Sequence, residues 1–343
     1  MNPSAYAAAL DEAALAHRPD RRVLVMEGRD PAAMLQGLAS NDVTRVAGGA
    51  CVYAVMLTPK GRMIADLRAL PGPGGALLVD VPAAAIDAVG AHLTRFVPPR
   101  MAKARPSDER ILGLYGPAAA ERLAPHAGGA APDPTPDALT RGPGGLLFVG
   151  TRYAGVPGVD VVGPPGALEG IATDLEAAGV PLLDPDTLEV LRVEAGSPRW
   201  GAELDEERIP LEAGLADRAI SQTKGCYTGQ EVIVRILHRG HVNWHLRGLT
   251  MGRSGPRPDR PAADGDGDGD GRLAPGAELT VPGETKVVAR VTSAVDSPRL
   301  GPIALGYVRR EVAPGSRLAL PGADPDAGAT DTARVVELPF EGA

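Results

Sequence analysis

The stretch TKGCYTGQEVIVRILHR, residues 223–239, predicts a loop that runs directly into an amphipathic helix. Thr228 is followed three residues later by Glu231, which is the spacing of a capping box. We therefore expect the helix to start at Gly229 and to continue through the apolar and basic residues that follow. The loop ahead of it contains one of only two cysteines in the chain.

The sequence leaves three roles open for Cys226: a reactive thiol, a metal ligand or a small packed residue. Two cysteines 175 positions apart give neither a disulfide framework nor paired metal-ligand spacing. The neighbouring Lys224 and the helix start both favour the thiolate form of Cys226, which would be nucleophilic if exposed. Free cysteine is also among the most buried residue types. Cys51, inside an apolar run, is expected to be a core residue.

Composition excludes several classes of protein. The net charge of -8 and the pI near 5.4 argue against a surface that coats nucleic acid or an anionic membrane. Aromatic residues make up only 3% of the chain, which weakens any base-stacking interpretation. No apolar run approaches the roughly 18–20 residues of a membrane span, and the N-terminal stretch lacks a signal pattern. We expect a cytoplasmic monomer that contacts neither nucleic acid nor membrane directly.

Strand and helix patterns alternate irregularly, which is typical of an α+β fold. Residues 51–70 predict a hairpin with Pro59 and Gly61 at its turn. We assign 1–246 to an α+β region of two interwoven subdomains. We assign 247–343 to a C-terminal β-barrel domain with a flexible insertion at 252–276. The insertion contains DGDGDG, but a calcium loop starting there would lack its bidentate carboxylate at the twelfth position.

A second candidate site lies at the end of a predicted helix. Asp184 followed by a proline starts this helix, and Gly196 ends it. Glu194 then occupies the last turn, where the helix dipole disfavours a carboxylate by about 0.3–1 kcal/mol. Such a residue is a candidate for ligand contact, and the alternative is a surface ion pair with Arg192 or Arg199.

Basic residues gather on the helix that follows the loop. Arg235, His238 and Arg239 fall at helical spacing, and further histidines follow. Nothing in the spacing brings a third zinc ligand to the same face. A site for carboxylates or phosphates fits better, and a solvated basic face is the alternative.

Several motifs together resemble one known family. They are KGCYTGQE (224–231), RGHVN (239–243), LRVEAGSPRWGAELDEERIPLEAGL (191–215), LQGLASNDV (35–43) and LTPKGRMIADL (57–67). The chain resembles the YgfZ branch of the family that includes the aminomethyltransferase of the glycine cleavage system. The resemblance implies three domains in a ring around a central folate pocket, the last of them a β-barrel. It also implies tetrahydrofolate binding and a role in making or repairing iron–sulfur clusters of client enzymes, including a tRNA-modifying one.

The resemblance also implies roles for individual residues. Glu194 matches the glutamate that grips the pterin ring, and a carboxylate can indeed accept two parallel hydrogen bonds from a pterin edge. Lys224 and Tyr227 belong to the string expected to meet the folate, and Arg235 and Arg239 are expected at its glutamate tail. Cys226 is the characteristic cysteine of the branch and is expected to be a functional thiol.

One departure bears on catalysis. The transferases carry adjacent aspartates after the hairpin turn, and here Ala65 precedes Asp66. An acid or base must lie within hydrogen-bond reach of the reacting nitrogen, so Asp66 is the remaining catalytic candidate. The leading hypothesis is a tetrahydrofolate-binding factor whose partners are iron–sulfur assembly or client proteins, without turnover of glycine intermediates. The alternatives are a folate-dependent aminomethyltransferase or demethylase that uses Asp66, and a scaffold with a vestigial pocket.

Overall fold

The computed structural model describes residues 1–251, 273–321 and 332–340. The chain divides into two compact units. Unit 1 comprises Met1–Leu188 and Arg199–His241, and unit 2 comprises Glu189–Pro198 and Val242–Ala343. The DGDGDG segment and nearly all of the insertion expected at 252–276 lie outside the described residues. No helix of the described ranges is long and apolar enough to cross a membrane.

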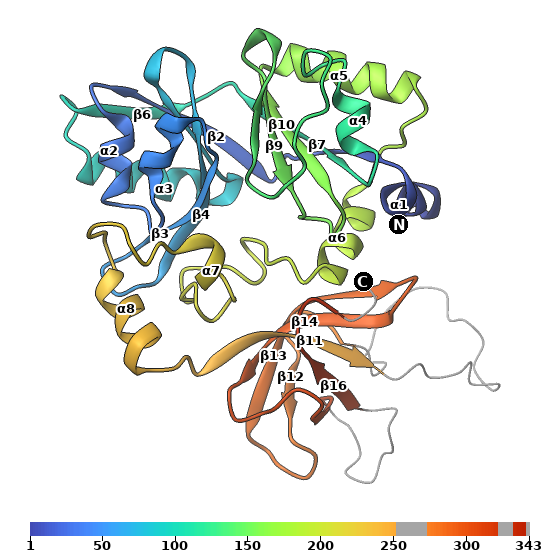
Figure 1. The fold of residues 1–343 in the computed structure, drawn as a ribbon. Coiled ribbons are helices and arrows are strands. Elements are labelled where there is room, and N and C mark those ends of the chain that lie inside the picture. Colours follow the sequence, from blue (N-terminus) through green and yellow to red (C-terminus); the bar gives the residue numbers. More distant parts are fainter. Residues whose placement is uncertain (252–272, 322–331, 341–343) are drawn as a thin grey trace. The chain divides into compact units, whose positions relative to one another are not determined.

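Unit 1 contains two five-stranded antiparallel sheets with helices on their faces (Figure 1). This arrangement confirms the mixed α and β content expected from the sequence. The first sheet has the order β3-β4-β5-β2-β6, with β3 Val52–Leu57, β4 Met63–Pro71, β5 Leu77–Pro82, β2 Arg21–Gly28 and β6 Ala102–Pro106. The second has the order β1-β7-β10-β9-β8, with β1 Ala14–His17, β7 Arg110–Tyr115, β10 Gly158–Gly163, β9 Leu147–Thr151 and β8 Leu139–Arg141.

The predicted hairpin is confirmed as β3 and β4. Its turn closes through two backbone hydrogen bonds, from Gly61 N to Thr58 O at 2.9 Å and from Thr58 N to Arg62 O at 2.8 Å. Gly61 has φ +74°, a left-handed conformation that glycine adopts without steric cost. The turn chemistry therefore fixes the hairpin locally.

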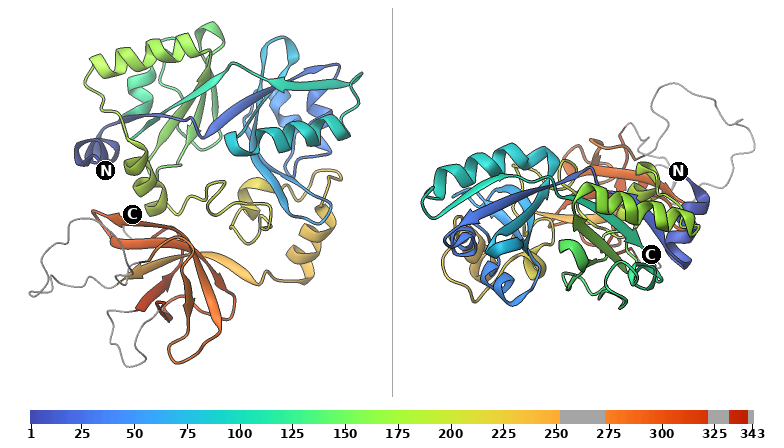
Figure 2. Two further views of the ribbon diagram at one scale, coloured as in Figure 1. Left: turned by 180° about the vertical axis from the view of Figure 1, so that it is seen from behind. Right: turned by 90° about the horizontal axis from the view of Figure 1, so that it is seen from above.

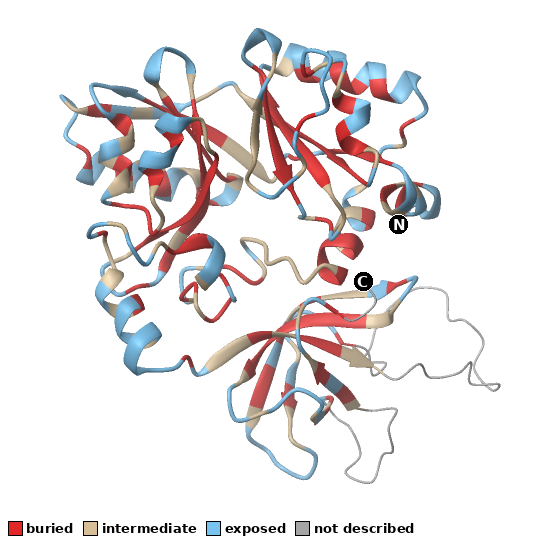
Figure 3. Ribbon diagram, viewed as in Figure 1, coloured by how far each residue is buried: buried red, intermediate tan, exposed pale blue. Residues whose placement is uncertain are grey.

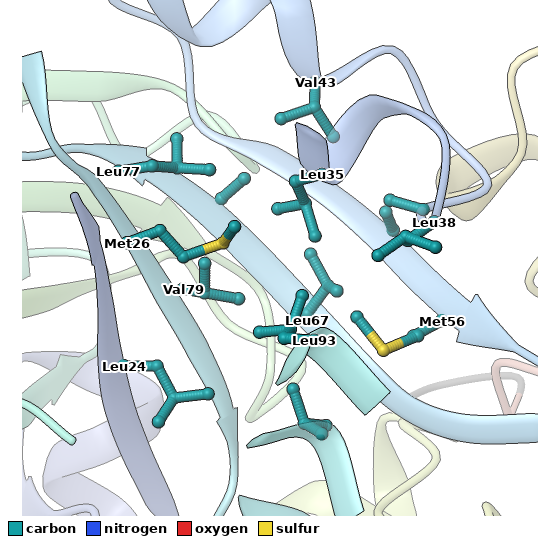
Figure 4. Packing of buried hydrophobic residues seen from close by; sticks show 14 of the residues in the cluster. Leu24, Met26, Leu35, Leu38, Val43, Met56, Leu67, Leu77, Val79 and Leu93 are labelled. Atoms are coloured by element: carbon teal, nitrogen blue, oxygen red, sulfur yellow. The ribbon is translucent and has the colours of Figure 1, made fainter. Parts of the chain in front are cut away.

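Helices cover one face of each sheet. On the first sheet α2 Pro31–Gln36 and α3 Ile86–Phe96 bury Leu35 and Leu93 among strand residues (Figure 4), and Val89 of α3 belongs to the same cluster. On the second, α4 Ala119–Leu123 and α5 Pro165–Ala177 pack in the same way, and Figure 2 shows α5 in lime green beside the green strands of this sheet. The opposite faces of the two sheets both contribute residues to one apolar cluster. Burial of these faces supplies most of the favourable free energy of folding.

Unit 2 contains a closed antiparallel barrel of order β11-β14-β13-β12-β15-β16. This finding confirms the predicted C-terminal barrel. The strands are β11 Trp244–Met251, β14 Gly301–Arg309, β13 Val287–Ser297, β12 Glu278–Thr280, β15 Arg317–Ala319 and β16 Thr332–Val336. Inward-facing residues such as Leu249, Ala304 and Val335 form its core.

The remaining elements connect these layers. They are α1 Pro3–Asp11, α6 Pro185–Glu194, α7 Ala216–Ala219 and α8 Gln230–Arg239, with 3-10 turns at Val43–Gly48, Pro73–Gly75, Ala83–Ala85 and Pro143–Gly145. Asp30 caps α2 as predicted, because its Oδ1 accepts a hydrogen bond from Ala33 N at 3.0 Å. Most of α8 is exposed (Figure 3).

Candidate functional site

Asp66 lies at one end of a buried chain of charges in unit 1. Its Oδ2 accepts a hydrogen bond from Arg21 at 2.7 Å, and Arg21 also contacts Asp80 at 2.8 Å. Arg68 then bridges Asp80 and Asp160, at 2.6 Å to each. Burial alone would raise the pKa of Asp80, but Arg21 and Arg68 outweigh it and hold that pKa below its ordinary value.

The two carboxylate oxygens of Asp66 differ in their hydrogen bonding. Oδ1 is buried and has no hydrogen-bond partner among the residues that the structure describes. The side chain as a whole keeps 8% of its surface exposed. A buried acceptor without a donor costs about 1–3 kcal/mol, so this oxygen is the point in the network best suited to receive a proton or a donor from a ligand.

The side chains of Ala65 and Asp66 lie on opposite faces of β4. Ala65 is fully buried in the apolar cluster beneath α2 and α3, whereas Asp66 faces Arg21. Successive side chains of a strand point to opposite faces, so neither position can stand in for the other. Ala65 therefore belongs to the apolar face of the strand, and the carboxylate of Asp66 lies on the charged face.

The loop 223–229 is anchored to the segment 36–41 by Lys224. Its Nζ donates to the carbonyl oxygens of Gln36 and Ala39 at 2.6 Å and of Asn41 at 3.1 Å. Burial lowers the pKa of Lys224 to about 8, with Asp42 opposing the shift. The ammonium hydrogens are thus directed to backbone carbonyls, which weakens the argument that Lys224 activates Cys226.

Helix α8 starts close to the predicted position, but its N-terminus is not capped in the predicted way. Gly229 is the N-cap, with φ +83°, and no side chain caps the helix, so the predicted Thr228–Glu231 capping box is wrong. Instead Gln230 Oε1 accepts from Tyr227 N at 3.1 Å, and Thr228 N donates to Gly37 O at 3.1 Å. The backbone of the loop is used for docking, and Thr228 does not occupy the capping position.

Gly229 lies directly against the hairpin turn. A Cβ at this position would lie 2.5 Å from Thr58 O and 3.4 Å from Gly61 Cα. Only glycine allows this approach in this conformation. Together with the Lys224 anchor, this contact brings three separate sequence motifs together in unit 1.

The two cysteines differ in environment. Cys226 is exposed, whereas Cys51 is buried, as expected for a core residue, and burial raises the pKa of its thiol to about 12. Tyr227 packs in an apolar cluster, with Lys224 Nζ 5.1 Å from its ring centroid. Its hydroxyl oxygen has no hydrogen-bond partner in the described ranges.

The basic side of α8 faces outward. Arg235, His238 and Arg239 are exposed, and Val234 and Leu237 leave 45% and 36% of their surfaces exposed beside them. Within the described residues, neither arginine forms an ion pair. The predicted cluster of cations is therefore present on one exposed helix of unit 1.

Glu194 belongs to unit 2. Asp184 caps α6 as predicted, because its Oδ1 accepts from Thr187 N at 2.8 Å, and Gly196 follows the helix end with φ +66°. The Glu194 side chain is only 1% exposed, and its two oxygens accept hydrogen bonds from Ser297 Oγ and from Arg299. Glu194 is therefore not on the surface, as the alternative of an exposed ion pair requires.

The predicted site residues are thus divided between the two units. Asp66, the loop residues and the α8 arginines lie in unit 1, and Glu194 lies in unit 2. Sequence reasoning missed the charged network, although charged residues inside the apolar runs LLVDVP and GVDVVG were a readable signal. It also missed Ser297 and Arg299, because their position beside Glu194 depends on closure of the barrel.

Comparisons with known proteins agree with this architecture. A model of the GCVT N-terminal domain matches residues 20–224. The aminomethyltransferase of Moorella thermoacetica is 31% identical over 336 residues, covering 92% of this chain and 83% of that protein. The aminomethyltransferase of Rubrobacter xylanophilus is 30% identical over 327 residues, covering 92% and 80%. The structure of glycine cleavage system aminomethyltransferase T from Bartonella henselae matches in fold, with a TM-score of 0.80, 20% identity and coverage of 98% and 88%.

Proposed function

This chain belongs to the GCVT family of folate-dependent, aminomethyltransferase-like proteins, and from that premise we propose that it binds tetrahydrofolate and takes part in one-carbon transfer. The curated relatives named above are aminomethyltransferases, which favours the transferase alternative over the iron–sulfur role. Bound tetrahydrofolate supplies the amine nitrogen that accepts the carbon unit. The chain's own residues must hold the pterin, orient it and move a proton.

Each of the two units contains side chains with the chemistry that such a ligand needs. Glu194 is a buried carboxylate whose orientation is fixed by Ser297 and whose charge is compensated by Arg299. A carboxylate suits the amino and ring N–H groups of a pterin, which would have to displace or share the hydrogen bonds from Ser297 and Arg299 to reach it. In unit 1, Arg235 and Arg239 form no ion pair with any residue that the structure describes, and they suit the carboxylates of the folate tail. Tyr227 adds a hydroxyl that has no partner in the described ranges.

The observation that carries the proposal is the unpaired Oδ1 of Asp66. Arg21 fixes the other oxygen of this carboxylate, and the charged network behind it holds Arg21 in place. A positioned carboxylate with one acceptor left can take up or return a proton at a reacting nitrogen. Asp66 is accordingly the proposed general acid–base group.

We expect Glu194→Gln to weaken tetrahydrofolate binding at least tenfold, about 1.4 kcal/mol, because an amide cannot accept two parallel hydrogen bonds as a carboxylate does. Isothermal titration of the full chain with tetrahydrofolate measures the effect. Glu278→Gln is the matched control, since Glu278 lies in the same unit and is half exposed on β12. Equal affinity of wild type and Glu194→Gln would remove Glu194 from the site, and no saturable binding to wild type would refute the proposal.

The exposed Cys226 supports a second candidate function. The KGCYTGQE string resembles the YgfZ branch, and its thiol is accessible while Cys51 is not. An accessible thiol can form a mixed disulfide or hold iron together with ligands from a partner protein. Under this candidate the chain binds tetrahydrofolate but serves iron–sulfur assembly or client proteins, including tRNA-modifying enzymes.

Turnover with an aminomethylated lipoyl carrier distinguishes the two functions. If the chain is a transferase, Asp66→Asn should lower turnover by about a hundredfold or more, the usual contribution of a positioned acid–base group. Tetrahydrofolate titration of the same variant checks that it is folded. A wild type without turnover, combined with a Cys226→Ser variant that fails to complement a strain lacking its YgfZ-type protein, would support the iron–sulfur function instead.

A further inference from the structure

A cleft of about 660 Å³ opens in unit 1 between the hairpin turn and α3. Lys60 and Arg62 of the turn line it on one side, and His92 and Arg95 of α3 line it on the other. This volume is in the range of pockets that hold small organic ligands, about 300–1,000 Å³. None of the residues proposed above to meet the folate lines it.

The shape of the cleft follows from α3. Ala88, Ala91, His92 and Arg95 lie at spacings of three and four residues, which places them on one stripe of the helix. The two alanines are too small to fill the space that faces the turn. Ile64, half-buried at the start of β4, adds apolar surface to the lining. The interior is thus largely apolar and its rim is charged.

The cations at the rim are only partly compensated, since Arg62 interacts electrostatically with Glu212. Lys60, Arg62 and Arg95 are exposed, and within the described part of the chain none of them lies within ion-pair distance of a carboxylate. Glu206 is the acidic residue that lines the cleft. The chain as a whole is acidic, with 43 acidic residues against 35 lysines and arginines. Three neighbouring cations without an ion pair in the described residues are therefore not explained by the overall composition. Such a cluster in a cleft attracts anions.

His92 adds a polar group at the same place. Its Nε2 is buried and has no hydrogen-bond partner in the described ranges. Burial and the nearby Arg95 lower the pKa of His92, so the imidazole is neutral near pH 7. A neutral ring can accept or donate one hydrogen bond to a ligand without adding charge.

We propose that this cleft binds a small organic polyanion, with at least two carboxylate or phosphate groups on an apolar body. The three cations would hold the anionic groups, and the stripe of α3 together with Ile64 would cover the body. His92 would supply one directional hydrogen bond. The site is independent of the folate proposal, because it uses a different set of residues on the turn and on α3.

Isothermal titration of the full chain with isophthalate, ADP and pyrophosphate at low salt tests the proposal: isophthalate carries two carboxylates on an apolar ring, ADP carries phosphates on a ring system, and pyrophosphate carries the charge alone. We expect saturable one-to-one binding of at least one probe, weakened at least about tenfold in the double variant Arg62→Gln/Arg95→Gln. The charge-matched control Arg105→Gln/Arg122→Gln removes two exposed arginines outside the cleft and should bind as wild type does.

A second variant tests the shape. Ala91→Leu keeps every charge and extends into the cleft from an exposed position on α3, so it should abolish binding without unfolding the chain. The His92 ring signals in NMR should shift on titration of the wild type. Absence of saturable binding by all three probes would overturn the proposal. Wild-type affinity in both Arg62→Gln/Arg95→Gln and Ala91→Leu would do so as well.

Discussion

Arg68→Met is expected to lower the free energy of unfolding by about 3–5 kcal/mol, since it removes the cation between two buried carboxylates. Arg68 contacts Asp80 and Asp160 at 2.6 Å each, and the side chains of these carboxylates are 0% and 2% exposed. Methionine has a similar volume, so the loss reflects the uncompensated charges rather than a cavity. Urea unfolding at neutral pH measures the difference.

The pH dependence provides a check that a packing defect would not reproduce. The pKa of Asp80 in the folded wild type lies below its ordinary value, so its contribution to stability is present at neutral pH and is lost as the pH falls through the folded pKa. Without Arg68 that pKa should rise, and protonation of Asp80 would relieve the penalty. The stability gap between wild type and Arg68→Met should therefore narrow as the pH is lowered from about 7 toward 4.

Arg105→Met is the matched control for this experiment. Arg105 pairs with Glu27, and both side chains are more than half exposed, at 61% and 54%. Exposed pairs contribute about 0–1 kcal/mol, so this variant should unfold almost as the wild type does. A loss of similar size in the two variants, or a gap that stays constant with pH, would contradict the assignment of the network as a stabilising element.

Gly229→Ala should cost about 2–4 kcal/mol, from two separate effects. The residue has φ +83°, where a side chain is strained, and its Cβ would lie 2.5 Å from Thr58 O. That carbonyl cannot easily retreat, because it accepts the hydrogen bond from Gly61 N that closes the turn. We expect α8 and the loop 223–229 to detach from the hairpin, measured as reduced unfolding free energy and faster hydrogen exchange in α8.

Substitutions at two other glycines separate the conformational effect from the steric effect. Gly201 has φ +82°, but a Cβ added there would have no atom within 4 Å, so Gly201→Ala should show only the conformational cost of about 1–2 kcal/mol. Gly225 has neither a positive φ nor a close neighbour, and Gly225→Ala should be nearly neutral. If Gly229→Ala is no more destabilising than Gly201→Ala, close packing against Thr58 is not what requires glycine at 229.

Local signals in the sequence predicted local structure well. Asp30 and Asp184 cap their helices, and the turn at 58–62 closes the hairpin, because each device uses atoms only a few residues apart. The same reasoning failed at Thr228. There the choice of cap depends on a carbonyl of Gly37 and on the turn at Thr58, which are distant in sequence.

The sequence by itself determined the family, the mixed α and β content, the C-terminal barrel and the buried position of Cys51, and it left the exposure of Cys226 open. These follow from periodicity, turn residues and motif strings, which are written along the chain. Only the tertiary structure decided which group each charged side chain contacts. Lys224 donates to backbone carbonyls, Glu194 pairs with Arg299, and Asp66 pairs with Arg21. Electrostatic and hydrogen-bond partners are set by distances of a few ångströms between residues far apart in sequence, and folding alone fixes those distances.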